Sequence, residues 1–171
     1  MDRLVLPPHR PEKLHHVLFA GVLVALFIFK WNDLHLPYFW DELGVYTQAA
    51  DYQYHHGISL MPASVPAWLS RGHPLFFVAL SASVLKLFGE NVFAAHLFSL
   101  FISSVLLFVV YRKTTKYFDS LTALVAVMLL AIQPLFLAQS ALVLPEITLA
   151  LFVLLALTAY YEKRFALFAL F

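Results

Sequence analysis

Two adjacent carboxylates, Asp41 and Glu42, directly follow an aromatic run at residues 38–40. They come just after the first hydrophobic segment, and acidic side chains at the edge of a bilayer are costly, so a functional role is the first interpretation. A carboxylate there can act as a general base or as a metal ligand. The structural alternative is that Asp41 caps the helix that follows, with Glu42 in its first turn beside the positive end of the helix dipole. The two roles can coexist.

Three further side chains could bind a phosphate. Arg71 and His73 lie in the sequence Arg-Gly-His-Pro-Leu-Phe, and Lys86 follows in the next apolar segment. Another carboxylate, Glu146, follows the sequence Val-Leu-Pro. Such groups suit a transferase acting on a lipid-linked phosphosugar, because the leaving group is an anion and the acceptor hydroxyl must lose a proton. The structural alternatives are a helix-entry role for His73 and a helix cap for Glu146.

The histidines do not predict a metal site. His55 and His56 are adjacent, so they point in different directions on a helix, and neither His35 nor His73 supplies a third ligand with suitable spacing. The chain contains no cysteine, which excludes a disulfide framework and a thiolate metal site. We therefore expect no cofactor, and the sequence gives no support for a divalent metal.

The composition is that of an integral membrane protein. Of the 171 residues, 62% are hydrophobic and only 12% are charged, whereas a soluble domain has about 45–50% apolar and about 25% charged residues. The mean hydropathy is +0.81. The formal net charge is +1 and no basic face stands out, so nucleic acid is not an expected partner. The expected surroundings are a lipid bilayer.

We expect an all-α polytopic membrane protein with about four transmembrane helices. The expected spans are residues 14–31, 93–111, 121–138 and 147–161. Pro134 should kink the third span, and Lys30 should snorkel from the first span into the interface. Residues 74–88 are fewer than the about 20 residues that a span needs, so this segment should be a juxtamembrane or re-entrant helix on the outer face.

The expected domain organisation follows from these spans. Residues 1–13 form a cytoplasmic tail, residues 14–165 form the membrane module with a long outer loop at 32–92, and residues 166–171 start a further, truncated span. The abrupt end leads us to expect a fragment or a truncated gene product. Within the loop, residues 41–56 should form an amphipathic helix that ends at Gly57. Its apolar face would be Leu43, Tyr46, Ala50 and Tyr54.

Basic residues predict the topology, because they are enriched in cytoplasmic segments. Three groups occur: Arg3, Arg10 and Lys13; then Arg112, Lys113 and Lys116; then Lys163 and Arg164. All three can face the cytoplasm only if residues 74–88 do not cross the membrane. The N-terminus is then cytoplasmic, and residues 32–92 and 139–146 share the outer face. This topology brings Asp41, Glu42 and Glu146 to one side of the membrane.

The order of these motifs resembles that of the polytopic glycosyltransferases of the GT-C class. The closest resemblance is to the bacterial family related to protein O-mannosyltransferases and to the aminoarabinose transferase of lipid A. Its members have an Asp-Glu pair in the first outer loop, a His/Lys-Pro-Pro-Leu-like element, a Phe-Gly turn, and an acidic residue after a Leu-x-Pro-like turn. The matching residues are Asp41-Glu42, His73-Pro74-Leu75, Phe88-Gly89 and Leu144-Pro145-Glu146.

The resemblance covers about residues 15–165, which would be the N-terminal third of a full member. Two departures concern the proposed site. The His73 element has one proline where many relatives have two, which bears on the phosphate contacts. Glu146 stands where the aminoarabinose enzyme has aspartate, which is a change of reach.

The resemblance implies an inverting transfer of a sugar from a polyprenyl phosphate to a hydroxyl acceptor on a lipid, a protein or a glycan, at the outer face of a bacterial inner membrane. Asp41 would be the catalytic base, Glu42 would help shape the catalytic site, and Glu146 would be its second acidic residue. His73, with Arg71 nearby, would contact the lipid phosphate. The 171 residues alone are expected to be inactive, because such a site needs walls from later helices.

A second function class remains open at this point: a non-catalytic polytopic membrane protein, such as a transporter half or an assembly subunit. A transporter is expected to place ionisable residues near the bilayer centre. The carboxylates of this chain lie at the outer rim of the expected spans. That placement favours the enzyme.

Overall fold

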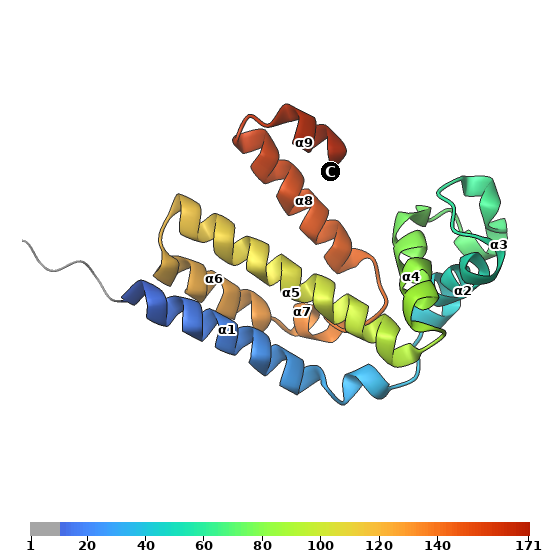
Figure 1. Ribbon diagram of the computed structural model, residues 1–171, viewed down its shortest axis with the longest axis horizontal. Coiled ribbons are helices and arrows are strands. Elements are labelled where there is room, and N and C mark those ends of the chain that lie inside the picture. Colours follow the sequence, from blue (N-terminus) through green and yellow to red (C-terminus); the bar gives the residue numbers. More distant parts are fainter. Residues whose placement is uncertain (1–10) are drawn as a thin grey trace, which may run out of the picture.

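The computed structural model describes residues 11–171, which form helices and turns and no strand within that range. Helices α1 (Pro11–Lys30), α5 (Val92–Tyr117) and α6 (Ser120–Ala131) form a bundle in which α6 packs against both α1 and α5 (Figure 1). Helix α8 (Glu146–Tyr161) packs against α5, and α9 (Phe165–Leu170) folds back on α8. The all-α prediction is confirmed for the described residues.

A second group of helices forms a cap at one end of this bundle (Figure 1). It contains the π-helical turn η2 (Glu42–Tyr46), α2 (Thr47–His56), the 3-10 turn η3 (Pro62–Ser64), α3 (Ala67–Ser70) and α4 (Leu75–Phe88). Helix α2 packs against α4, and the short 3-10 turn η1 (Asp33–His35) connects α1 to the cap and packs on α5. The cap is built from residues 32–92, the long loop expected from the sequence.

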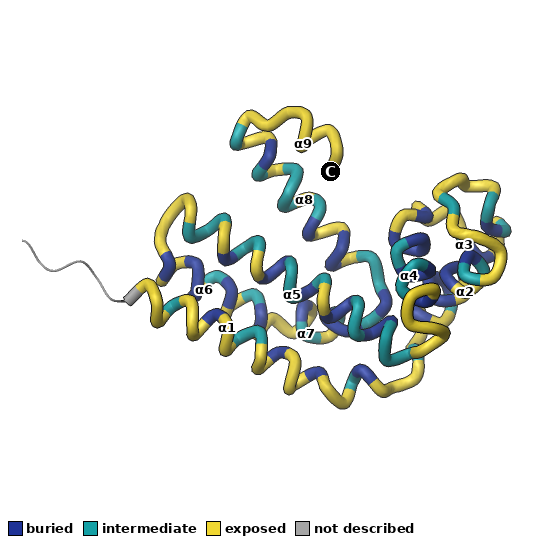
Figure 2. Tube along the Cα trace, in the orientation of Figure 1, coloured by how far each residue is buried: buried dark blue, intermediate teal, exposed yellow. Residues whose placement is uncertain are grey.

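Two hydrophobic cores correspond to these two groups. The bundle core includes Phe19, Leu107, Val127 and Leu151, and the cap core includes Ala49, Val78 and Ala82. Phe19 stacks on Tyr111 with a centroid separation of 4.2 Å, which joins α1 to α5. Figure 2 shows that α9 and the outer side of α1 are exposed, as expected for surfaces that face lipid.

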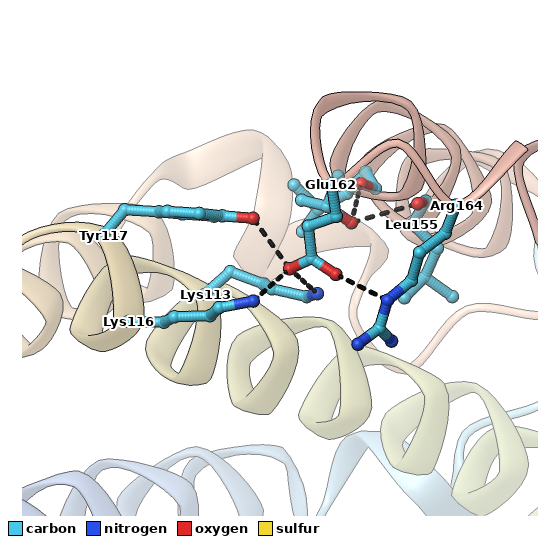
Figure 3. Close-up of polar contacts among 8 residues, drawn as sticks. Lys113, Lys116, Tyr117, Leu155, Glu162 and Arg164 are labelled. Atoms are coloured by element: carbon cyan, nitrogen blue, oxygen red, sulfur yellow. Dashed lines mark hydrogen bonds and ion pairs between the residues drawn. The ribbon is translucent and has the colours of Figure 1, made fainter.

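Side-chain contacts fix which helix ends meet. His15 Nδ1 lies 2.7 Å from Ser120 Oγ, and Lys113 Nζ donates to Glu162 Oε1 at 2.9 Å. The N-terminal end of α1 therefore lies at the same end of the bundle as the C-terminal ends of α5 and α8. Glu162 also accepts from Lys116 and Tyr117 and forms an ion pair with Arg164 (Figure 3). The basic groups, except Arg3 and Arg10 outside the described residues, thus gather opposite the cap.

Two helices, Glu12–Lys30 and Val92–Tyr117, are long and apolar enough to cross a membrane. The expected third span is not one helix: α6 ends at Ala131, Gln133 is extended, and α7 (Pro134–Gln139) starts afresh. Proline lacks an N–H and disfavours the helical conformation in the residue before it. The helix is therefore interrupted at the position where only a kink was expected. Helix α8 is about 24 Å long, shorter than the about 30 Å hydrocarbon core, so four spans stay a prediction.

Helix α5 extends past the expected end at residue 111. Arg112, Lys113 and Lys116 therefore lie in its last turns, beside the negative end of the dipole, and not in a loop. Asp119 caps α6 by accepting from the N–H groups of Leu121 and Thr122. Only a two-residue connection, residues 118–119, separates α5 from α6.

The helix expected at residues 41–56 ends at Gly57 (φ 110°), as predicted. Two residues of the expected apolar face, Tyr46 and Ala50, are buried as predicted. The helix begins, however, with a π-helical turn, in which each turn holds more residues than in an α-helix, so the face differs in this first turn. Val45, Tyr46 and Ala49 are buried, whereas Leu43 is exposed. The expected position of Leu43 on the buried face is therefore wrong.

Candidate active site

Tyr46 lies in the turn η2, which follows Asp41, and it contacts the turn that holds His73. Its ring centroid lies 5.5 Å from that of His73 and 5.8 Å from that of Phe77 in α4. Burial raises the pKa of the Tyr46 phenol, and the nearby charges of Glu146 and Asp41 raise it further. The 71–74 turn therefore lies against the segment that follows Asp41, at one buried phenol. The sequence predicts Tyr46 only as part of an apolar helix face.

Asp41 is exposed and directly follows Trp40, whose φ is 38°. Such a left-handed conformation is uncommon for a bulky residue and marks a tight turn. The Asp41 side chain makes no capping hydrogen bond with the helix that follows. The interpretation that the Asp41 side chain caps a helix N-terminus is therefore wrong. The turn instead presents the Asp41 carboxylate at the surface of the group of helices that forms the cap.

Glu42 has the opposite environment: it is 1% exposed and accepts three hydrogen bonds. Oε1 accepts from His96 Nε2 at 3.0 Å and from the Val143 N–H at 2.7 Å, and Oε2 accepts from the Phe39 N–H at 2.9 Å. Burial alone would raise the pKa of Glu42, but these three hydrogen bonds outweigh it and hold the pKa below its ordinary value. Glu42 thus joins the 32–92 and 139–146 segments as a carboxylate.

His96 belongs to this site and was missed from the sequence, where it was interpreted as lining a helix–helix contact. It is 2% exposed, and its Nδ1 lies 3.3 Å from the carbonyl oxygen of Leu34. The Tyr38 ring packs edge-on against the imidazole at a centroid distance of 5.5 Å. One signal in the sequence could have found it: His96 is an ionisable side chain in the otherwise apolar start of α5, and such a residue within a span is a candidate functional residue.

Arg71 and His73 flank Gly72 in a turn of left-handed residues, with φ 48° at Arg71 and 79° at Gly72. The His73 N–H donates to the Ser70 carbonyl oxygen at 2.8 Å. Both side chains are exposed, and a cavity of about 400 Å³ lined by residues 72–76 opens beside them. His73 therefore satisfies its backbone N–H at the entry to α4, as the structural alternative expected, and it also contacts Tyr46.

The other predicted residues lie in different places. Glu146 is exposed in the first turn of α8, where its charge lies at the positive end of the dipole. Lys86 is exposed near the far end of α4, about 16 Å along the helix from Leu75. The structure brings His73 to Tyr46 and brings Val143, three residues before Glu146, to Glu42, whereas Lys86 lies near the other end of α4.

One group within residues 11–171 has side chains that could hold a metal: Asp51, His55 and Glu90, whose ligand atoms lie within 4.8 Å of one another. His55 Nε2 is 3.0 Å from Glu90 Oε1 and 3.5 Å from Asp51 Oδ1. The partners of His55 are thus carboxylates and not the histidines considered from the sequence. All three residues are exposed, and the close contacts of the imidazole with the two carboxylates account for the arrangement.

Comparison with known proteins gives one family. Residues 72–166, more than half of the chain, match the family described as dolichyl-phosphate-mannose-protein mannosyltransferase. The matched segment contains His73 and Glu146, and the Asp41-Glu42 pair precedes it. Neither the curated proteins nor the solved structures gave a match. The chain belongs to the dolichyl-phosphate-mannose-protein mannosyltransferase family, a membrane-embedded family of the GT-C glycosyltransferases.

Proposed function

We propose that the protein is a glycosyltransferase that moves a sugar from a polyprenyl-phosphate donor to a hydroxyl acceptor on a lipid, a protein or a glycan, with inversion at the anomeric carbon. The observation that carries this proposal is that the 71–74 turn and the loop before Glu146 both contact the segment that holds Asp41: His73 packs on Tyr46, and the Val143 N–H donates to Glu42. The family match supports the reaction class.

The proposed reaction assigns a task to each group. Asp41 accepts the proton of the acceptor hydroxyl, whose oxygen attacks the anomeric carbon from the face opposite the leaving group. The bond between that carbon and the phosphate oxygen breaks, and the electron pair leaves with the polyprenyl phosphate. Arg71 and His73 attract this anion, and Glu146 is the second acidic residue of the site. Lys86 is too far along α4 to act with His73 in this arrangement.

We also propose that the cap faces the outside of a bacterial inner membrane and that the N-terminus is cytoplasmic. The supporting observation is the gathering of basic residues at the end of the bundle opposite the cap. Lys13, Lys113, Lys116 and Arg164 lie there, with the acid Glu162 among them. Basic residues are enriched on the cytoplasmic side of membrane proteins.

The test is sugar transfer by membranes that contain the protein at its full natural length, with a labelled polyprenyl-phosphate sugar as donor. Asp41→Asn and Asp41→Ala should both fold, because the side chain makes no capping bond. Both should lose activity by about 10²–10⁴-fold, the usual contribution of a general base. Asp51→Asn, an exposed acid of the same cap, is the matched control and should retain activity.

Near wild-type transfer by both Asp41 variants would refute the assignment of the base. If the wild-type protein transfers no sugar from polyprenyl-phosphate donors, the non-catalytic membrane protein becomes the better interpretation. Melting temperatures of all variants in detergent distinguish loss of chemistry from loss of fold.

A further inference from the structure

A buried pair, Glu42 and His96, joins segments that are distant in the sequence. We propose that this pair is a lock that positions Asp41 relative to the second outer loop, with His96 as a positioning residue of the reaction. The inference rests on the proposed function, because it takes Asp41 as the catalytic base. It adds a residue in α5, outside the Asp-Glu pair and outside the predicted phosphate contacts.

Glu42 is not available to a substrate. It is 1% exposed, and both of its carboxylate oxygens already accept hydrogen bonds. Its Oε1 binds one donor from α5 and one from the loop before α8, namely His96 Nε2 and the Val143 N–H. Val143 is itself 1% exposed, so water cannot easily replace Glu42 as its partner. Glu42 therefore holds two loops together, and any effect on the reaction comes from the position that it gives to neighbouring residues such as Asp41.

Glu42 also fixes the shape of the turn that holds Asp41. The Phe39 N–H donates to Glu42 Oε2 at 2.9 Å, and the Glu42 N–H donates to the Phe39 carbonyl oxygen at 3.0 Å. This reciprocal pair encloses Trp40 and Asp41. Trp40 has a φ of 38°, an unfavourable conformation for a bulky side chain that persists only where surrounding contacts maintain it. The backbone of Asp41 is fixed as a consequence.

His96 contacts both segments that flank this turn. Both ring nitrogens face acceptors: Nε2 faces the Glu42 carboxylate and Nδ1 faces the Leu34 carbonyl oxygen. His96 thereby connects α5 to η1 and to η2, the two segments that flank the Asp41 turn. Removal of His96 would leave the buried Glu42 carboxylate short of a hydrogen-bond partner, and the turn would lose its anchor on the bundle.

The test compares two substitutions of the same residue. His96→Phe keeps a ring and removes both donors, whereas His96→Gln keeps an N–H that can reach Glu42. The control is Ser99→Ala, one turn further along α5, because the Ser99 hydroxyl bonds only to its own helix, at the Ala95 carbonyl oxygen. Each variant is made in the protein at its full natural length.

The first readout does not depend on activity. Spin labels at Leu43→Cys and Leu149→Cys, both exposed positions, report the distance between η2 and the start of α8. We expect one narrow distance distribution in the parent and in the Ser99→Ala and His96→Gln proteins, and a broadened one in His96→Phe. A narrow distribution in His96→Phe would overturn the lock. If His96→Phe does not fold, Glu42→Gln, which keeps the shape of the side chain, is measured in its place with the same expectation.

The second readout separates positioning from general structural support. We expect the kcat of sugar transfer to fall at least tenfold in His96→Phe, with the KM for the donor within about twofold, and to recover in His96→Gln. Unchanged kcat with a broadened distance would overturn the positioning role. If even the wild-type protein transfers no sugar, the proposed function fails, while the distance measurement still decides whether the lock exists.

Discussion

The pair formed by Lys30 and Asp33 allows a quantitative prediction of stability. The sequence predicts that Lys30 snorkels into the membrane interface, and the structure adds that its side chain is buried by protein: it is 7% exposed, and Nζ donates to Asp33 Oδ2 at 2.8 Å. The Asp33 side chain is 42% exposed, so one partner of the pair is buried and the other contacts solvent. We expect Asp33→Asn to destabilise the protein, because it leaves a buried cation without its partner.

The size of the effect follows from two limits. At 2.8 Å, the Coulomb attraction is about 6 kcal/mol with an effective dielectric constant of about 20, and about 1.5 kcal/mol in water. Breaking a fully buried pair costs about 3–5 kcal/mol, whereas an exposed pair contributes about 0–1 kcal/mol. Because only one partner is buried, we expect Asp33→Asn to lower the free energy of unfolding by about 1–3 kcal/mol.

The companion variant is Lys30→Met, which replaces the buried cation by an apolar side chain of similar length. Replacing a buried ion by a hydrophobic residue is often neutral or stabilising, so Lys30→Met should stay within about 1 kcal/mol of wild type. In this background, Asp33→Asn should have almost no further effect. The two substitutions are therefore expected to be non-additive, as contacting residues usually are.

Reversible unfolding in mixed micelles of dodecyl maltoside and dodecyl sulfate, followed by far-ultraviolet circular dichroism, gives the free energies. Asp41→Asn is the control, because this exposed carboxylate makes no capping hydrogen bond. The reasoning is refuted if Asp33→Asn lies within about 0.5 kcal/mol of wild type, the range of ordinary surface substitutions. It is also refuted if Lys30→Met is the more destabilising of the two.

Three further predictions concern other parts of the chain. Hydrogen bonds from Lys116 and Lys113 hold the pKa of Glu162 well below its ordinary value of 4.5. Its stabilisation is therefore complete above pH about 4.5 and is lost as the pH falls below it. Glu162→Gln should melt below wild type at pH 7, and the difference should shrink below pH 4.5; a constant difference would contradict this. Trp40→Gly should stay within about 1 kcal/mol of wild type, because relief of about 1–2 kcal/mol of left-handed strain offsets the entropy of glycine. Trp40→Val should be less stable than Trp40→Gly in the same unfolding assay, and the reverse order would argue against strain. In intact cells, an impermeant thiol reagent should label Gln48→Cys but not Phe118→Cys, both exposed positions in a chain without native cysteine; the opposite pattern would exclude the proposed topology.

Several features follow from the sequence by itself. The long apolar segments predict an all-α membrane protein, Gly57 predicts the end of the helix that begins near Asp41, and Pro134 predicts a disruption in the third apolar segment. These signals act locally, because glycine and proline restrict or relax the backbone within a few residues. The positions at which helices end were less predictable. The third apolar segment is two helices, with α7 starting at Pro134, and α5 continues through the basic residues that were assigned to a loop.

The tertiary structure alone decided how the candidate site is assembled. Glu42 meets His96 and Val143 across 54 and 101 residues of sequence, and no local pattern predicts such a pairing. The sequence placed Asp41 and Glu42 together as acids of one site, whereas folding exposes the first and buries the second. The physical reason is that a side chain in a turn follows the turn's backbone, and this backbone is fixed by contacts with α5 and with the loop before α8, which exist only after the helices have packed.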